Sequence, residues 1–92
     1  MNPRCDVCAG GTASAGSTTV TFTNDRPGSC TINGLGSLLD CGNSFTVPGR
    51  SGGNAGTKTC NILGTATAGK YEYTVGGGVN CPKETNPSII YQ

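Results

Sequence analysis

Short runs in which large apolar residues alternate with polar ones constrain the fold of this chain most. In the clearest run, residues 69–75, the side chains of Tyr71, Tyr73 and Val75 share one parity, and charged or small residues lie between them. A period of two is what a β-strand with one buried face requires, whereas a helix would need a period near 3.6. The sequence therefore predicts a β-protein built around this strand.

The same alternation recurs along the chain, between turn signals rich in Gly, Pro and Asn. Strands are predicted near residues 17–24, 29–33, 44–48, 57–63, 70–76 and 87–91, with one uncertain strand in 35–39 that could instead be one helical turn. The residues expected in the core are Val20, Phe22, Ile32, Phe45, Val47, Ile62, Tyr71, Tyr73, Val75 and Ile90. This spacing of strands is typical of an all-β fold, a disulfide-stapled Greek-key β-sandwich.

Six cysteines in 92 residues indicate how such a chain is stabilised. Only 34% of the residues are hydrophobic and 16 are glycine, so the core is thin. Small domains of this kind rely on disulfides, which persist in oxidising compartments. We therefore expect a secreted protein, extracellular or at the cell surface, with the periplasm as a further option. No signal-peptide pattern opens the chain, so the mature form is expected.

The charges exclude two classes of partner. Six basic and five acidic residues are scattered along the chain and give a net charge of +1. Nucleic-acid binding needs clustered Lys and Arg to neutralise phosphates, and anionic membranes need a basic patch. No apolar run approaches the roughly 20 residues of a membrane-spanning helix. The expected partners are therefore other protein subunits, with no nucleic acid and no membrane span.

Residues 1–16 differ from the rest because they show no periodicity. We interpret them as an extended N-terminal arm, and residues 17–92 as the sandwich domain. The arm carries Cys5-x-x-Cys8, which could be a disulfide, a redox dithiol or half of a metal site. The second C-x-x-C of a zinc ribbon is missing, and a redox C-x-x-C normally opens a helix. A structural role is favoured.

Residues for catalysis are hard to find. The chain has no histidine, the usual general base for a Ser, Thr or Cys nucleophile. No motif joins any two of the five acidic residues, and the glycines at 76–78 precede neither a helix nor a GK[ST] sequence. A non-enzymatic protein is expected, with no catalytic residue, no cofactor and no bound metal.

Four segments together resemble the cupredoxin-like β-sandwich: VTFTN (20–24), SFTVPG (44–49), G-x-Y-x-Y-x-V (69–75) and NPSII (86–90). The resemblance covers about residues 17–92. In copper-binding members the metal is held by two His, a Cys and usually a Met, a ligand set suited to electron transfer. Here Cys30 lies near the first His position, Val75 at the thiolate position and Cys81 in the ligand loop. The only Met is Met1, so the resemblance implies the fold without the copper.

The resemblance also bears on the cysteine pairing, which spacing alone leaves open among 15 schemes. It implies that Cys30 and Cys81 converge and form a disulfide where the copper would lie. Cys41 would then pair with Cys60, which shares an inward face with Ile62. The pair Cys5 and Cys8 would form a local ring or link to another chain. The rival scheme joins Cys30 to Cys41 and Cys60 to Cys81.

Two classes of function remain. The first is a structural or interaction module of the cell exterior, such as a subunit of a surface appendage or filament, assembled as a homo-oligomer or polymer through the arm. The alternative is a thiol protein that uses Cys5-x-x-Cys8 for redox exchange or metal capture. Counting thiols without reductant and measuring the oligomeric state would separate the two classes.

Overall fold

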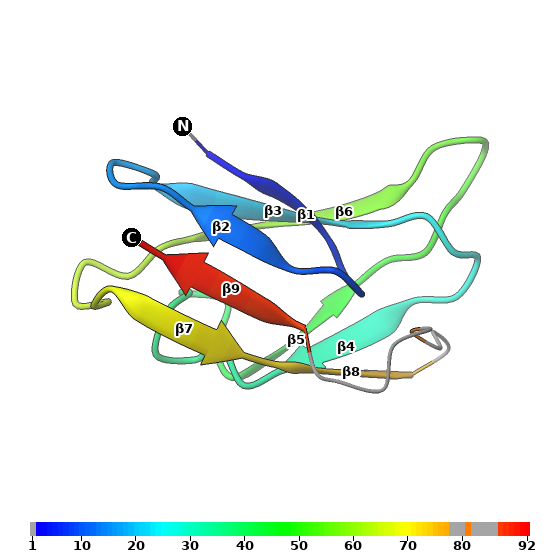
Figure 1. Ribbon diagram of the computed structural model, residues 1–92. Helices are drawn as coiled ribbons and strands as arrows, with labels where there is room; N and C mark the ends of the chain where they lie inside the picture. The colour runs from blue at the N-terminus through cyan, green and yellow to red at the C-terminus, as the bar shows by residue number, and fades with distance from the viewer. Residues whose placement is uncertain (1, 78–80, 82–86) are drawn as a thin grey trace.

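The chain forms three small β-sheets. The computed structural model describes residues 2–77, 81 and 87–92; Met1 and most of the predicted ligand loop, residues 78–80 and 82–86, lie outside the described residues. Its described part contains nine short strands and no helix, so the all-β class is confirmed. Three small sheets stand in place of a clear two-sheet sandwich (Figure 1). Among the residues described, no helix is long and apolar enough to cross a membrane.

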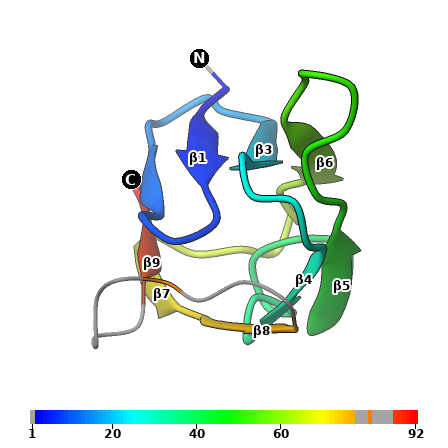
Figure 2. The ribbon, with the colours of Figure 1, turned by 90° about the vertical axis from the view of Figure 1, so that its right-hand side faces the viewer.

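Each sheet has three strands. Sheet A has the order β1 (Arg4–Asp6), β3 (Thr19–Asn24) and β6 (Gly56–Asn61). Sheet B has the order β2 (Gly11–Ala13), β9 (Ser88–Tyr91) and β7 (Gly69–Glu72). Sheet C has the order β5 (Ser44–Val47), β4 (Cys30–Asn33) and β8 (Thr74–Gly77). Figure 2 shows the three sheets arranged around a common interior.

The strand predicted at residues 70–76 is divided at Tyr73. Up to that residue the chain pairs with β9, and the Tyr73 amide still donates to the carbonyl of Pro87 (3.0 Å). From Thr74 onward it pairs with β4 instead. One continuous segment therefore joins sheets B and C, and the change of partner separates them into two small sheets.

The alternating side chains of β3 form one side of the core. Val20, Phe22 and Asn24 are buried, while the threonines between them are half-exposed. The Phe22 ring lies 5.4 Å from the ring of Phe45 and 5.8 Å, edge-on, from the ring of Tyr73. These three rings bring strands of sheets A and C into contact with the residue that links sheets B and C.

Six predicted core residues are buried as expected: Val20, Phe22, Ile32, Phe45, Val47 and Tyr73. Three others, Ile62, Tyr71 and Val75, are partly buried against the core. The prediction for Ile90 is wrong, because its neighbour Ile89 points inward and is fully buried. Two adjacent isoleucines carry no alternation, so the sequence could not show which one faces the core.

The uncertain strand at 35–39 is a turn, in which the amides of Leu38 and Leu39 both donate to the carbonyl of Leu35. All three leucines are buried. Buried side chains thus come from a turn as well as from strands, and period-two alternation does not detect such a turn.

The N-terminal arm is strand-forming. It packs against two sheet edges of its own chain. β1 pairs in parallel with β3, and β2 pairs in parallel with β9. Four of its side chains lie in the core: Cys5, Val7, Cys8 and Ala13. Residues 5–13 therefore contribute to the same core as the rest of the domain.

Candidate functional site

The disulfide between Cys41 and Cys60 is the one predicted pairing that the structure confirms, with 5.6 Å between the Cα atoms. Cys60 faces inward from β6. Beside it, the Asp40 amide donates to the carbonyl of Asn61, and the Asp40 carboxylate accepts hydrogen bonds from the backbone and side-chain nitrogens of Asn61. These bonds from Asn61 hold the pKa of Asp40 below its ordinary value.

The second disulfide joins Cys8 to Cys81 and corrects the other pairings. Cys30 does not bond to Cys81, and Cys5 and Cys8 form no local ring; Cys5 and Cys30 are free thiols. The rival scheme, Cys30–Cys41 with Cys60–Cys81, is also wrong. The cause is the arm: because it folds into strands, Cys8 rather than Cys30 lies beside Cys81.

A tight turn after β1 places Cys8. The carbonyl of Asp6 accepts hydrogen bonds from the amides of Ala9 and Gly10, and the Asp6 carboxylate accepts one from the amide of Cys8 (2.8 Å). Gly10 has a φ of 66°, and a Cβ there would lie 2.0 Å from the carbonyl oxygen of Ser88. Only glycine fits this position, where the turn crosses the start of β9. Cys5 precedes the turn and points into the core, whereas Cys8 is part of the turn itself.

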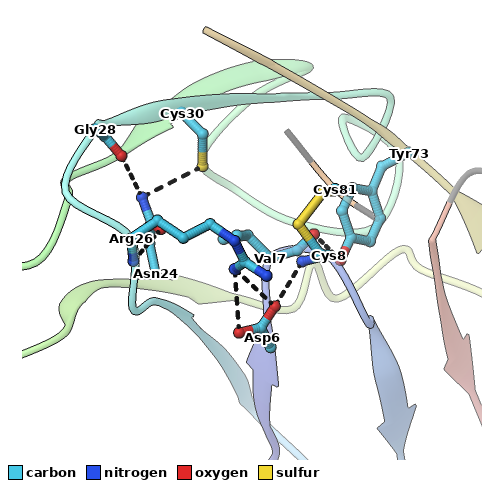
Figure 3. The surroundings of a disulfide bond; sticks show 9 residues. All are labelled: Asp6, Val7, Cys8, Asn24, Arg26, Gly28, Cys30, Tyr73 and Cys81. Atoms are coloured by element: carbon cyan, nitrogen blue, oxygen red, sulfur yellow. Dashed lines mark hydrogen bonds and ion pairs between the residues drawn. A yellow bond between two sulfur atoms is a disulfide. The ribbon is translucent and has the colours of Figure 1, made fainter. Parts of the chain in front are cut away.

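Polar side chains gather around the Cys8–Cys81 disulfide, as Figure 3 shows. Arg26 forms an ion pair with Asp6 (3.3 Å). The amide of Arg26 donates to Asn24, whose side chain is fully buried and in turn donates to the carbonyl of Gly28 (2.8 Å). Tyr73 closes the group from the core side, with its hydroxyl donating to the carbonyl of Val7 (3.0 Å). Residues from three separate parts of the chain thus fix the turn that holds Cys8.

The two free thiols lie within the core. Cys5 and Cys30 are each 1% exposed. Cys5 sits beside Phe22 in sheet A, and the sulfur of Cys30 lies 3.9 Å from the side-chain nitrogen of Asn24. Burial raises the pKa of both thiols, and the charge of Arg26 opposes this only in part at Cys30. Burial also raises the pKa of Tyr73. Protonated, enclosed thiols are poor nucleophiles and poor metal ligands.

The two cysteines of the C-x-x-C motif differ in chemical state. Cys8 is bonded to Cys81, whereas Cys5 is a buried free thiol. Among the described residues, no three His, Cys, Asp or Glu side chains lie close enough together to hold a metal ion. The Asp6 carboxylate is paired with Arg26. The arrangement is suited to fixing the turn after β1 onto the domain.

Sequence reasoning missed this site, although one signal was present. Arg4, Cys5, Asp6 and Val7 alternate between polar and apolar residues, the same period of two as the strands that were found. In the structure Cys5 and Val7 are buried, as that pattern would require. The run was too short to stand out beside the Gly- and Ala-rich residues that follow it.

Comparison with known proteins adds no identification. No protein-family model, no curated protein and no solved structure matches the chain. The resemblance to cupredoxins is therefore not supported by any match.

We expect the two free thiols to be unreactive toward thiol reagents in the folded protein. Without reductant, a thiol reagent such as DTNB should detect two thiols per chain in denaturant and almost none in buffer, because both sulfurs are enclosed. The denatured count is the control for disulfide formation. Rapid reaction of the native protein would contradict the burial described here, and a count of zero would show a third disulfide.

The free energy of unfolding should fall in alkaline solution. Folded-state pKa values raised by burial mean that the unfolded chain releases protons first from Cys5 and Cys30. Their stabilising contribution is thus fully present below the pKa of an unfolded thiol, about 8.5, and is lost as the pH rises above it. Urea unfolding at pH 7 and pH 10 measures the loss. In a Cys5→Ala/Cys30→Ala variant the loss should be smaller; an equal loss would assign it to other groups.

Proposed function

We propose that this protein is a non-enzymatic structural or interaction module of the cell exterior, which assembles with further copies of itself. The observation that carries the proposal is the use of a terminal strand: β1 completes sheet A by parallel pairing at the edge of β3. Addition of an extended segment at a sheet edge is also a recurring means by which β-proteins bind segments of other chains. In an assembled form, such as a surface appendage or filament, that pairing would link subunits.

Two features support an exterior location. Two disulfides indicate an oxidising compartment. The remaining two thiols are enclosed, which protects them from oxidation there. Extracellular or cell-surface exposure is the setting we propose, with the periplasm as the alternative.

We also retain the cupredoxin-like Greek-key sandwich as the proposed relationship of the fold. Three of the segments that carry the resemblance contain strands at the expected places, with residues 19–24 in β3, residues 44–47 in β5 and residues 88–91 in β9. The third segment, residues 69–75, runs from β7 into β8 and so joins two sheets.

The thiol alternative is less well supported. A redox dithiol needs two neighbouring sulfurs that can exchange, one of them exposed with a lowered pKa. Here Cys8 is already bonded to a residue 73 positions away, and burial raises the pKa of Cys5.

The oligomeric state of the untagged protein tests the proposal. Light scattering coupled to size-exclusion chromatography should show species larger than a monomer, with a share that rises with protein concentration. Electron microscopy of the same samples would distinguish closed oligomers from filaments. A monomer of 9.2 kDa at every concentration would contradict self-assembly.

A further inference from the structure

We propose that residues 2–6, here called the exchange segment, can leave their own domain and pair with β3 of a second copy of this chain. The inference rests on the proposed function and specifies its mode. The receiving site is the edge of β3 that β1 covers in the structure. A second copy presents an identical segment, so the fit seen within one chain is also the fit expected between two.

Hydrogen bonds hold the N-terminal end of the exchange segment. The side-chain oxygen of Asn2 accepts hydrogen bonds from the amides of Thr18 (2.7 Å) and Thr19 (3.2 Å). The carbonyl of Pro3 accepts one from the amide of Thr21 (3.1 Å). All of these bonds can be re-formed in another copy, which is why exchange of identical elements is a low-cost route to assembly.

Little of the exchange segment is buried. Within residues 2–6 only the side chain of Cys5 is buried; the others are exposed or half-exposed. β1 is also the edge strand of sheet A, in the order β1-β3-β6. β1 can therefore detach without passing another strand of that sheet. Its departure removes one small side chain from the core.

The chain is locked immediately after the segment. Val7 is fully buried, its amide donates to the carbonyl of Thr23, and its carbonyl accepts the Tyr73 hydroxyl. Cys8 is fastened to Cys81. A hinge at Asp6, immediately before the locked Val7, thus divides a removable strand from a domain that the disulfide keeps closed. In this interpretation the Cys8–Cys81 disulfide keeps the remainder of the domain folded while the segment moves.

The reach of the segment limits the geometry. Five extended residues span roughly 16 Å at 3.3 Å per residue, so the two copies must lie with their β3 edges close together. Mutual exchange closes a dimer, whereas one-way donation from copy to copy builds an open chain. Both use the same contact between the segment and β3.

A mixed cross-linking experiment tests the inference. Arg4 and Thr21 are register partners across β1 and β3, and both lie on the outer side of sheet A. A ¹⁵N-labelled Arg4→Cys chain and an unlabelled Thr21→Cys chain are mixed in a glutathione redox buffer. A disulfide between labelled and unlabelled chains forms at this register only if the segment of one lies on β3 of the other. Intact mass spectrometry identifies that species.

The matched control replaces Thr21→Cys by Thr57→Cys, an exposed threonine one strand further away, on β6. We expect severalfold more mixed disulfide with Thr21→Cys than with Thr57→Cys. A single chain carrying both Arg4→Cys and Thr21→Cys serves as the positive control, since it should form the bond within itself. Equal yields in the two mixtures would overturn the inference.

The result separates this inference from the proposed function. If the unmodified protein forms oligomers but the two mixtures give equal yields, the subunits associate through another surface and only the exchange is wrong. If the unmodified protein is monomeric at every concentration, both fail.

Discussion

Replacing both Cys8 and Cys81 by alanine should lower the free energy of unfolding by about 4 kcal/mol, because the disulfide closes a loop of 73 residues in the unfolded chain. A domain of this size has only about 5–15 kcal/mol in total, so most of its stability could be lost. The double variant is preferred over either single one, since it leaves no new thiol. Urea unfolding followed by far-UV circular dichroism measures the change.

The Cys41→Ala/Cys60→Ala variant is the matched control. Its disulfide closes only 19 residues, for which the same chain-entropy argument gives about 3 kcal/mol. We therefore expect the Cys8→Ala/Cys81→Ala variant to lose more stability than this control. A smaller loss at Cys8 and Cys81 than at Cys41 and Cys60 would contradict the pairing that ties the turn after β1 to the domain.

The strands that could be predicted from sequence share one property. Each, like β3 with Val20 and Phe22 between threonines, has one apolar face and one polar face, and this is the only feature that period-two alternation detects. Where that condition fails, the prediction fails too. Leu35, Leu38 and Leu39 are buried from a turn, and adjacent Ile89 and Ile90 show no alternation.

The candidate site was less predictable because its pairings depend on distant contacts. Strand parity could favour Cys41 with Cys60, because Cys60 points inward from a strand that was correctly predicted. It could not place Cys8 beside Cys81, because that contact requires β2 to pair with β9, the last strand of the chain. An assumed cupredoxin arrangement brought Cys30 to Cys81 instead. Assigning Cys8 to a local ring with Cys5, or to a link with another chain, left it out of the disulfides expected within the domain.

The second large effect is expected at Phe22, where the three sheets meet. Its side chain is fully buried and its ring contacts those of Phe45 and Tyr73. Truncation to alanine leaves a cavity and removes two aromatic contacts, so Phe22→Ala should cost about 3–5 kcal/mol. Phe22→Leu keeps most of the volume and should cost clearly less.

Tyr71→Ala provides the matched control, because Tyr71 is only partly buried and its hydroxyl bonds locally to the carbonyl of Thr67. Unfolding in urea should rank the three variants, with Phe22→Ala the least stable. Because Cys5 is the register partner of Phe22, the cavity should also open a path to the Cys5 thiol. Phe22→Ala should therefore react with DTNB under native conditions faster than Tyr71→Ala. Equal rates in these two variants would show that Phe22 does not enclose Cys5, and that the thiol is protected by the strand pairing of β1 alone.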